Sequence, residues 1–140
     1  MKRATQIFAL TLTLLPLLAV AQMRSSDKLV ANVPFQFKAG DKAIPAGQCI
    51  VESATMGGHT LAILNVAAKT STLVSAMPEP SNEATGRYSL VFHKYGDRYF
   101  LTGIRQGGKT IDRLPESGAE AELRAQNVAA TEEVLLASIK

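Results

Sequence analysis

Two extended segments that meet at a Gly-Asp pair constrain the fold of this chain more than any other feature of its sequence. Residues 87–95 and 98–105 are rich in apolar and aromatic side chains, and they flank Gly96 and Asp97. A two-residue connection with glycine in its first position is typical of a type II′ β-hairpin, because that position needs a positive φ. The sequence therefore predicts an antiparallel hairpin that turns at Gly96.

This turn also predicts which residues lie opposite each other on the two strands. The expected pairs are Lys94–Tyr99, His93–Phe100, Phe92–Leu101, Val91–Thr102 and Leu90–Gly103. Apolar side chains occur on both faces of such a hairpin, and an apolar face has to be covered in a folded protein. We therefore expect the hairpin to be central in the fold, with other elements on each side.

The clearest single strand is predicted earlier in the chain. Residues 29–37 alternate with a period of two, which is the pattern of an extended chain with one buried side. The apolar set is Leu29, Ala31, Val33, Phe35 and Phe37. Pro34 interrupts the other side and has no backbone N–H, so it predicts an edge position or an unpaired site.

Shorter segments complete the predicted architecture. Strands are expected at 48–53, 60–66, 70–76 and 109–114, a buried strand at 133–139, turns at 39–42 and 56–58, and a polar loop at 78–86. Ser117 and Glu120 form a capping-box pattern that predicts a helix over residues 118–128. Together these elements predict a mainly β fold, either an antiparallel β-sandwich or a small barrel of about seven strands, with one short helix near the C-terminus.

Residues 1–21 have the pattern of a cleavable secretory signal peptide. Two basic residues precede an apolar run over residues 7–20, and Ala19 and Ala21 supply the small side chains that signal peptidase requires. This run is shorter than the roughly 20 apolar residues of a membrane-spanning helix. We therefore expect export to the periplasm or the extracellular space. The expected mature chain is a single β-rich domain over residues 22–140, without a stable membrane span.

Cleavage at that point changes the charge balance. The full chain has 15 Lys and Arg residues against 12 Asp and Glu residues, for a net charge of +3. Lys2 and Arg3 leave with the signal segment, so 13 basic residues remain against the same 12 acidic ones. A nearly neutral domain without a basic run has little electrostatic attraction for nucleic acid, and no nucleic-acid partner is expected.

Cys49 is the only cysteine of the chain, which excludes an intramolecular disulfide. It lies in the apolar stretch 48–51, where cysteine commonly serves as a small buried residue. In an oxidising compartment, an intermolecular disulfide is the alternative.

Several motifs resemble those of a family of small exported β-rich proteins of the acidobacterial type. They are Val33-Pro34-Phe35-Gln36-Phe37, Ile44-Pro45-Ala46-Gly47-Gln48, the run 90–101 that contains Phe92-His93-Lys94-Tyr95-Gly96-Asp97-Arg98-Tyr99-Phe100-Leu101, and Leu114-Pro115-Glu116-Ser117 before Glu120. The sequence departs from the family pattern at Ile44, where leucine is usual, and at Cys49, where tyrosine is expected. The resemblance implies export, one domain and the hairpin, and it implies no reaction and no ligand.

No catalytic, metal-binding or cofactor-binding residue is predicted. His59, His93 and Cys49 show no recognisable metal-ligand spacing. A Cys49–His93 pair would activate a thiolate only if the fold brought the two together. Carboxylates near the predicted helix, such as Glu116 and Glu120, are explained by capping and by the helix dipole. The chain is therefore expected not to be an enzyme.

The densest aromatic and polar cluster is a candidate binding surface on the hairpin. It comprises Tyr88, His93, Tyr95, Arg98, Tyr99, Phe100 and Arg105. Such a set can stack a sugar ring or hold an extended peptide, although ordinary cross-strand pairing also explains it. We expect a non-enzymatic binding or structural module that acts through its sheet surface or an edge strand near Pro34, with an envelope protein or a glycan as partner. The alternative is a β-barrel carrier of an apolar ligand.

Overall fold

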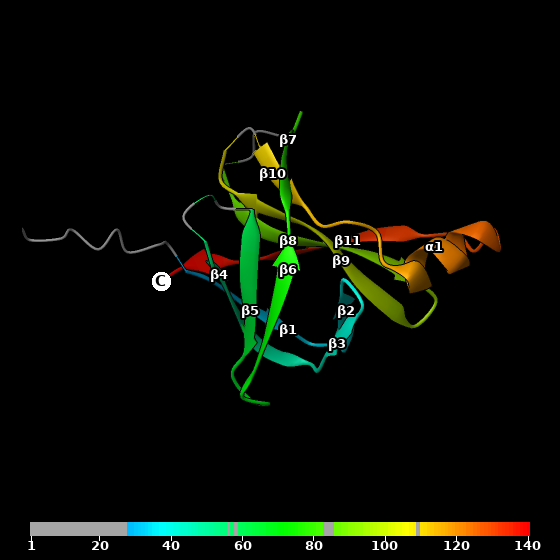
Figure 1. The fold of residues 1–140 in the computed structure, drawn as a ribbon, viewed down its shortest axis with the longest axis horizontal. Helices are drawn as coiled ribbons and strands as arrows, with labels where there is room; N and C mark the ends of the chain where they lie inside the picture. Colours follow the sequence, from blue (N-terminus) through cyan, green and yellow to red (C-terminus); the bar gives the residue numbers. More distant parts are fainter. Residues whose placement is uncertain (1–27, 56, 58, 83–85, 109) are drawn as a thin grey trace, which may run out of the picture.

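The structure, a computed structural model, describes residues 28–55, 57, 59–82, 86–108 and 110–140 (Figure 1). The predicted signal segment 1–21 lies outside these residues, as do two residues of the predicted 56–58 turn and part of the predicted 78–86 loop. Within the described ranges the chain forms twelve strands in two sheets and one short helix. The expected mainly β class with a short helix near the C-terminus is confirmed, with more strands than predicted.

The first sheet is antiparallel throughout and has the strand order β12-β1-β4-β5-β6. In that order its strands span Ser138–Ile139, Leu29–Val33, Gly47–Ser53, Thr60–Asn65 and Thr70–Ser75. The second sheet has the order β11-β8-β9-β10-β7, over Thr131–Leu136, Tyr88–Tyr95, Arg98–Gln106, Thr110–Arg113 and Met77–Pro80. β2 (Phe37–Ala39) pairs in parallel with the start of β9 and forms a hairpin with β3 (Lys42–Ile44). The described strands do not close into a barrel.

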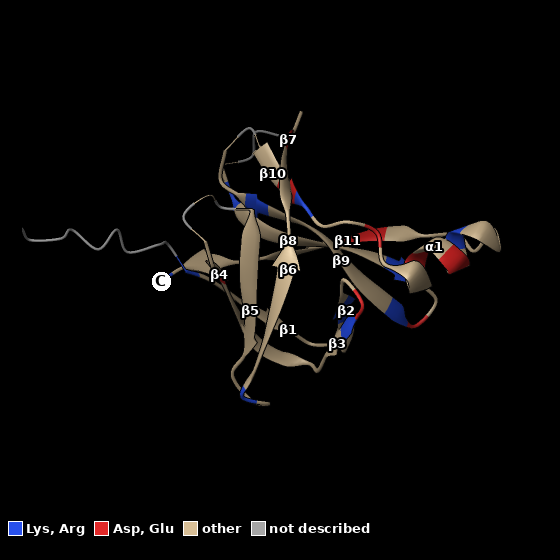
Figure 2. Ribbon diagram, viewed as in Figure 1, with Lys and Arg blue, Asp and Glu red and all other residues tan. Residues whose placement is uncertain are grey.

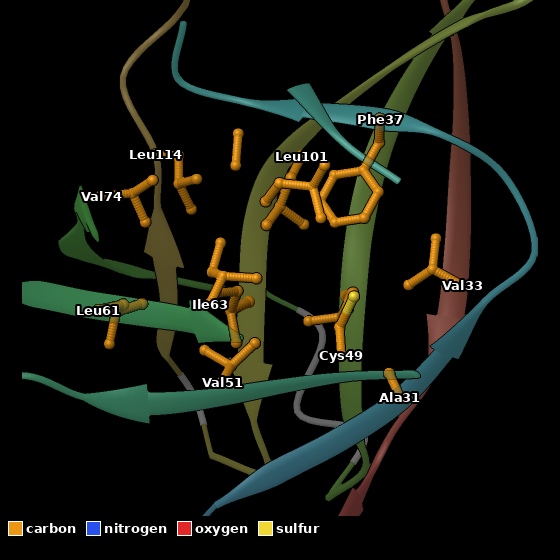
Figure 3. Close-up of a cluster of buried hydrophobic side chains, with 14 of the residues drawn as sticks. Ala31, Val33, Phe37, Cys49, Val51, Leu61, Ile63, Val74, Leu101 and Leu114 are labelled. Carbon is orange, nitrogen blue, oxygen red and sulfur yellow. The ribbon is translucent and has the colours of Figure 1, made fainter. Parts of the chain in front are cut away.

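One apolar core lies between the sheets and takes residues from both of them (Figure 3). The first sheet contributes the inward side of β1, β4, β5 and β6, including Val33 and Cys49, which are both 0 % exposed. Phe92 of β8, also 0 % exposed, meets the ring of Phe37 at 5.2 Å between centroids with the planes nearly perpendicular. The core is therefore filled by interlocking side chains, and the expected burial of Cys49 is confirmed.

The predicted central hairpin is confirmed, and its register shifts at one residue. Lys94–Tyr99, His93–Phe100 and Phe92–Leu101 pair as expected, and Gly96 has the positive φ of +61° that the turn requires. Thr102 is then an extra residue, so Val91 pairs with Gly103 and Leu90 with Ile104. The predicted pairs Val91–Thr102 and Leu90–Gly103 are therefore wrong. The hydroxyl of Thr102 donates to the Val91 carbonyl at 3.2 Å, so this carbonyl has a hydrogen-bond partner at the bulge.

The alternating segment 29–37 is split between the two sheets. β1 ends at Val33, Pro34 is exposed and outside any strand, and β2 starts at Phe37 in the second sheet. The predicted unpaired site at Pro34 is confirmed, but the prediction of one continuous strand over residues 29–37 is wrong. The missing N–H of proline removes a ladder bond at the point where the chain changes sheets.

Two other predictions need correction. The segment predicted as a loop from residue 78 begins with β7, which pairs with β10 and holds two prolines at a sheet edge, where proline is tolerated. The predicted buried strand at 133–139 is instead divided between β11 and β12 and is mostly exposed, with Leu135 and Ala137 packed against the core. Leu136, for example, is 64 % exposed. An apolar run indicates a strand but does not show whether its outer side has a neighbour.

The helix α1 (Gly118–Ala125) begins as predicted and ends early. Ser117 is the N-cap, and its hydroxyl accepts the N–H of Glu120 at 3.2 Å. Asn127 has a left-handed φ of +58°, so the helix cannot continue to the predicted residue 128.

Two extended segments each cross from one sheet to the other. Residues 70–80 run from β6 in the first sheet through buried Ala76 to β7 in the second, and residues 131–139 run from β11 in the second sheet through Ala137 to β12 in the first. The outermost strands of both main strand orders therefore belong to these two crossing segments (Figure 1).

Candidate functional site

The seven residues of the predicted binding surface do not lie on one face. The register places Tyr88 and Tyr99 on the side of the hairpin that faces the first sheet, where Tyr99 stacks on Phe35 with 3.7 Å between ring centroids. The other five residues, His93, Tyr95, Arg98, Phe100 and Arg105, lie on the opposite face. The structure thus brings four of the seven together near the Gly96 turn, places Arg105 on the same face at the other end of the hairpin, and packs the two others against the core.

Even among those five, exposure differs strongly. Tyr95 is 5 % exposed and Phe100 is 2 % exposed, and their rings meet edge to face at 5.7 Å between centroids. Arg98 lies over the Phe100 ring at 5.6 Å. These contacts are ordinary cross-strand packing, which was the alternative explanation for this aromatic cluster in the sequence. His93 and Tyr95 line one cavity of the described residues, and Arg98, Tyr99 and Phe100 line another of similar volume beside β2 and β3. His93 brings a titratable ring to the first of these cavities.

That cavity, of about 180 Å³, lies where α1 meets the hairpin strands. Its lining residues come from β8, β9, β10 and α1 with the loop before it, and they are His93, Tyr95, Thr102, Arg113, Leu114, Glu116, Glu120 and Arg124. Figure 2 shows acidic and basic residues gathered on α1 and the neighbouring strand ends. We call this the helix pocket.

The carboxylate of Glu120 links two other residues of the helix pocket. One carboxylate oxygen, Oε1, lies 2.7 Å from Nδ1 of His93 and accepts the hydroxyl of Tyr95 at 3.0 Å. The Glu120 side chain is 7 % exposed, whereas that of His93 is 35 % exposed. Burial, the hydrogen bond to Glu120 and the negative charge of that carboxylate raise the pKa of Tyr95 to about 12. Tyr95 therefore remains a hydrogen-bond donor at neutral pH.

Sequence reasoning assigned Glu120 to helix capping and missed this role. The Glu120 N–H donates to the Ser117 hydroxyl, as a capping box predicts. The Glu120 carboxylate, however, turns toward the sheet and contacts His93, 27 residues away in the chain. Arg113 and Arg124 were also missed. Nothing in the local pattern around these residues indicates that the chain brings them to one cavity.

The charges of the helix pocket are balanced. Arg124 pairs with Glu116 at 3.0 Å, and Nε of Arg113 lies 3.5 Å from Glu79. Because Nδ1 of His93 is engaged by Glu120, its Nε2 is the ring nitrogen left for a ligand. Within the described part of the chain, no three His, Cys, Asp or Glu side chains gather in a way that could hold a metal ion. The pocket chemistry suits hydrogen bonding to a polar or acidic group.

A wider, open groove of about 670 Å³ lies where β1 extends beyond the short strand β12. Its lining residues carry no titratable side chain, and they are Val30, Ala31, Asn32, Gln48, Leu136, Ala137 and Ser138. This groove supplies hydrogen-bonding groups and apolar contacts but no group for acid–base chemistry.

The outer edge of β6 presents unpaired main-chain groups. Ala76 donates its N–H to the His59 carbonyl at 2.8 Å, which makes this a bonded pair in the β5–β6 ladder. Bonding alternates along an antiparallel ladder, so Thr72 and Val74 also point their main-chain groups toward β5. The groups that point away from β5 are those of Ser71, Leu73 and Ser75. In the described residues no strand pairs with that side.

The other outermost strands carry features that discourage pairing with another chain. β7 contains Pro78 and Pro80, β11 contains Glu132 and Glu133, and β12 has only two residues. β6 has the sequence Thr-Ser-Thr-Leu-Val-Ser, with no charge and no proline, and β5 and β6 are free of charged residues in Figure 2. Of the described edges, β6 presents the longest stretch without charge or proline; the uncovered end of β1, residues 31–33, is shorter and is followed by Pro34.

Apolar side chains accompany this edge on the outer face of the first sheet. Leu73 is 65 % exposed and pairs with Ala62, and the next row places Leu64, Ile50 and Val30 side by side. We call the outward groups of Ser71, Leu73 and Ser75, with this apolar face, the β6 edge. It lies on the opposite side of the sheet from the edge expected near Pro34, where residues 31–33 of β1 extend beyond the two residues of β12.

No described helix has the length and apolar character needed to cross a membrane. Comparisons with protein-family models, with curated proteins and with solved structures found no match to this chain.

Proposed function

We propose that this protein is an exported, non-enzymatic binding module that holds an extended polypeptide segment along the β6 edge. The observation that carries the proposal is the row of outward main-chain groups at Ser71, Leu73 and Ser75, on a strand without charge or proline. Strand addition uses such groups for affinity and the neighbouring side chains for selectivity. Residues 1–21 support the export part of the proposal through their signal-peptide pattern.

The recognition mechanism combines polar and apolar contacts. Each main-chain hydrogen bond contributes about 1 kcal/mol net. Covering a fully exposed leucine side chain contributes about 2 kcal/mol at most, and Leu73 starts from 65 % exposure. The entropy lost by the bound segment offsets much of this. We therefore expect selectivity for uncharged segments of high β-propensity, with an apolar residue placed against Leu73.

The alternative, a carrier of an apolar ligand inside a barrel, gains no support from the interior. Phe37, Phe92 and Leu101 occupy the space between the sheets, and all three are nearly or fully buried. Three cavities of the described residues are open to the surface and are lined in part by polar groups.

A binding test uses two exposed leucines on different edges. Leu73 of β6 and Leu136 of β11 are 65 % and 64 % exposed, so Leu73→Lys and Leu136→Lys are matched substitutions. Peptides of about six residues, the length of a typical strand, are selected from a random library on the immobilised protein. We expect the selected peptides to bind the Leu136→Lys variant like the unmodified protein and to bind the Leu73→Lys variant roughly tenfold more weakly.

Two outcomes would contradict the proposal. Selected peptides that bind both variants equally well would place the contact elsewhere. A library that yields no binder would show that the β6 edge does not accept a peptide. Export is tested separately by cell fractionation with intact-mass measurement, and a mass that includes residues 1–21 would overturn that part.

A second candidate function, binding of an acidic group, is favoured by the helix pocket. Glu120 holds His93 by Nδ1, and Arg113 lines the same cavity. The probe is the His93 ring signal in NMR spectra during titration with sodium acetate or inorganic phosphate, with sodium chloride as the control for ionic strength. We expect a saturable shift that Arg113→Gln abolishes, and a linear response equal to that of the chloride control would exclude this function.

A further inference from the structure

We infer that the segment received by the β6 edge is the β6 edge of a second copy of this chain, so that the protein forms a two-fold symmetric dimer. This inference rests on the proposed strand addition and names its partner. The observation behind it is the sequence of the edge itself. Residues 70–76 read Thr-Ser-Thr-Leu-Val-Ser-Ala, which is nearly the same in either direction about Leu73. A two-fold axis requires this property, because the same patch must complement itself.

Antiparallel pairing about an axis at Leu73 satisfies every outward group. Leu73 lies opposite Leu73 of the partner subunit, and Ser71 lies opposite Ser75 of the partner subunit. All three outward residues then form bonded pairs that exchange N–H···O=C hydrogen bonds in both directions. The two five-stranded sheets become one continuous sheet, and the row of unpaired groups disappears.

Side chains agree with this register on both faces. On the outer face the two Leu73 side chains meet at the axis, where each covers part of a surface that is 65 % exposed in the single chain. Within β6 the small side chains of Ser71 and Ser75 flank them on this face, and small side chains permit close approach. On the inner side Thr72 lies opposite Val74 of the partner subunit, a pair of β-branched residues that suits a sheet.

Charge explains why this edge pairs with itself and the others do not. The paired segment contains no charged residue, so no like charges meet across the axis. An equivalent pairing of β11 would bring Glu132 and Glu133 of both copies to one seam. In β7 the two prolines remove donors from the strand. Because a two-fold contact uses the β6 edge of both copies, the assembly closes at two chains.

The register is tested by charge substitutions at two exposed serines. Because Ser71 faces Ser75 across the axis, the double variant Ser71→Lys with Ser75→Lys places like charges opposite each other. The double variant Ser71→Lys with Ser75→Glu places opposite charges there and has the same two positions altered. Sedimentation equilibrium should give a dimer for the unmodified protein and for the Lys–Glu variant. We expect a dissociation constant roughly tenfold higher for the Lys–Lys variant.

Disulfide trapping tests the axis directly. Bonded antiparallel residues have Cα atoms about 5.5 Å apart, within the range that a disulfide spans. Leu73→Cys should therefore form a covalent dimer under mild oxidation. Leu136→Cys, at an equally exposed site, is the control for random collisions, and the unmodified protein controls for Cys49, which is 0 % exposed.

Each result bears on either the dimer or the binding edge. Equal trapping at positions 73 and 136, or equal dissociation constants for the two serine double variants, would overturn the two-fold register. A single-chain mass up to about millimolar concentration, where only very weak association remains undetected, would overturn the second copy as partner. The peptide selection against Leu73→Lys remains informative in that case, because it tests the edge with a different occupant.

Discussion

Glu120 is the residue that ties the helix to the sheet. Within α1, which the structure describes throughout, it is the one buried residue, and its carboxylate contacts both His93 and Tyr95. A buried carboxylate with two hydrogen bonds is stable in place, whereas its removal leaves the partners desolvated and unsatisfied. The attachment of α1 therefore depends on one polar contact more than on apolar packing.

Replacing Glu120 measures this dependence. Glu120→Ala should lower the free energy of unfolding by about 1–3 kcal/mol, because the Tyr95 hydroxyl and the His93 ring lose their shared acceptor. Glu120→Gln keeps an acceptor oxygen and should cost less. Chemical denaturation provides the measurement, with Glu122→Ala as the control on the exposed side of the same helix. Equal effects of Glu120→Ala and Glu122→Ala would show that the contact contributes nothing.

The raised pKa of Tyr95 predicts a pH dependence at the alkaline end. The phenol titrates near pH 10 in the unfolded chain and near pH 12 in the folded one, where burial and Glu120 favour its neutral form. The stability that it contributes is thus complete below about pH 10 and is lost as the pH rises toward about 12. Lysines titrate in the same range, so the readout is the difference between the unmodified protein and Tyr95→Phe. That difference should shrink between pH 10 and 12, and a constant difference would refute the assignment.

At the scale of the elements, periodic segments were predictable and edges were not. The hairpin at Gly96 and the strand starting at Leu29 follow from alternation and turn chemistry, which are local properties. β7 and β11 form strands because they pair with elements far away in the sequence. β7, which contains two prolines, pairs with β10, and β11 pairs with β8 on one of its sides. The bulge at Thr102 depends on a bond to the neighbouring strand, which no single-strand pattern encodes.

The same division holds for the candidate sites. His93 and Tyr95 stood out as a polar and aromatic pair on one strand. Their partner Glu120 belongs to the helix α1, which is distant from that strand in the sequence. Likewise, the sequence predicted a strand near residues 70–76 from its β-branched composition. That this strand ends the sheet, with Leu73 exposed, follows only from the strand order.

The N-cap of α1 gives a prediction for the element as a whole. Ser117 is 6 % exposed, and its hydroxyl accepts the N–H of Glu120 at 3.2 Å. Ser117→Ala should reduce the free energy of unfolding by about 1 kcal/mol, the usual effect of losing such a cap. It should also weaken the His93–Glu120 contact by loosening the first helical turn, which a change in the His93 ring signal would report. Ser138→Ala, at an exposed strand position outside the β6 edge, is the control. An unchanged His93 signal would show that cap and pocket are independent.

For the molecule as a whole, the two crossing segments decide which edges remain open. β12 covers part of β1 through the pairs Leu29–Ile139 and Val30–Ser138, and Lys140 adds a bond to the Lys28 carbonyl at 2.9 Å. β1 itself carries no charged residue. With β12 in place, β6 is the one uncharged edge strand of the described first sheet that is open along its whole length, and a two-fold pairing there uses its outward groups.

Deleting residues 138–140 should change the assembly from closed to open. The deletion uncovers β1, so that each chain offers two uncharged edges in the first sheet and pairing no longer ends at two copies. Light scattering should then show species larger than a dimer, whereas deletion of Lys140 alone, which leaves both β12 pairs, should not produce them. Adding Ser71→Lys with Ser75→Lys to the deletion blocks one of the two edges and should return the protein to small assemblies. Large species that persist in this combined variant would show that β6 takes no part in the association, which would count against the self-complementary edge as well.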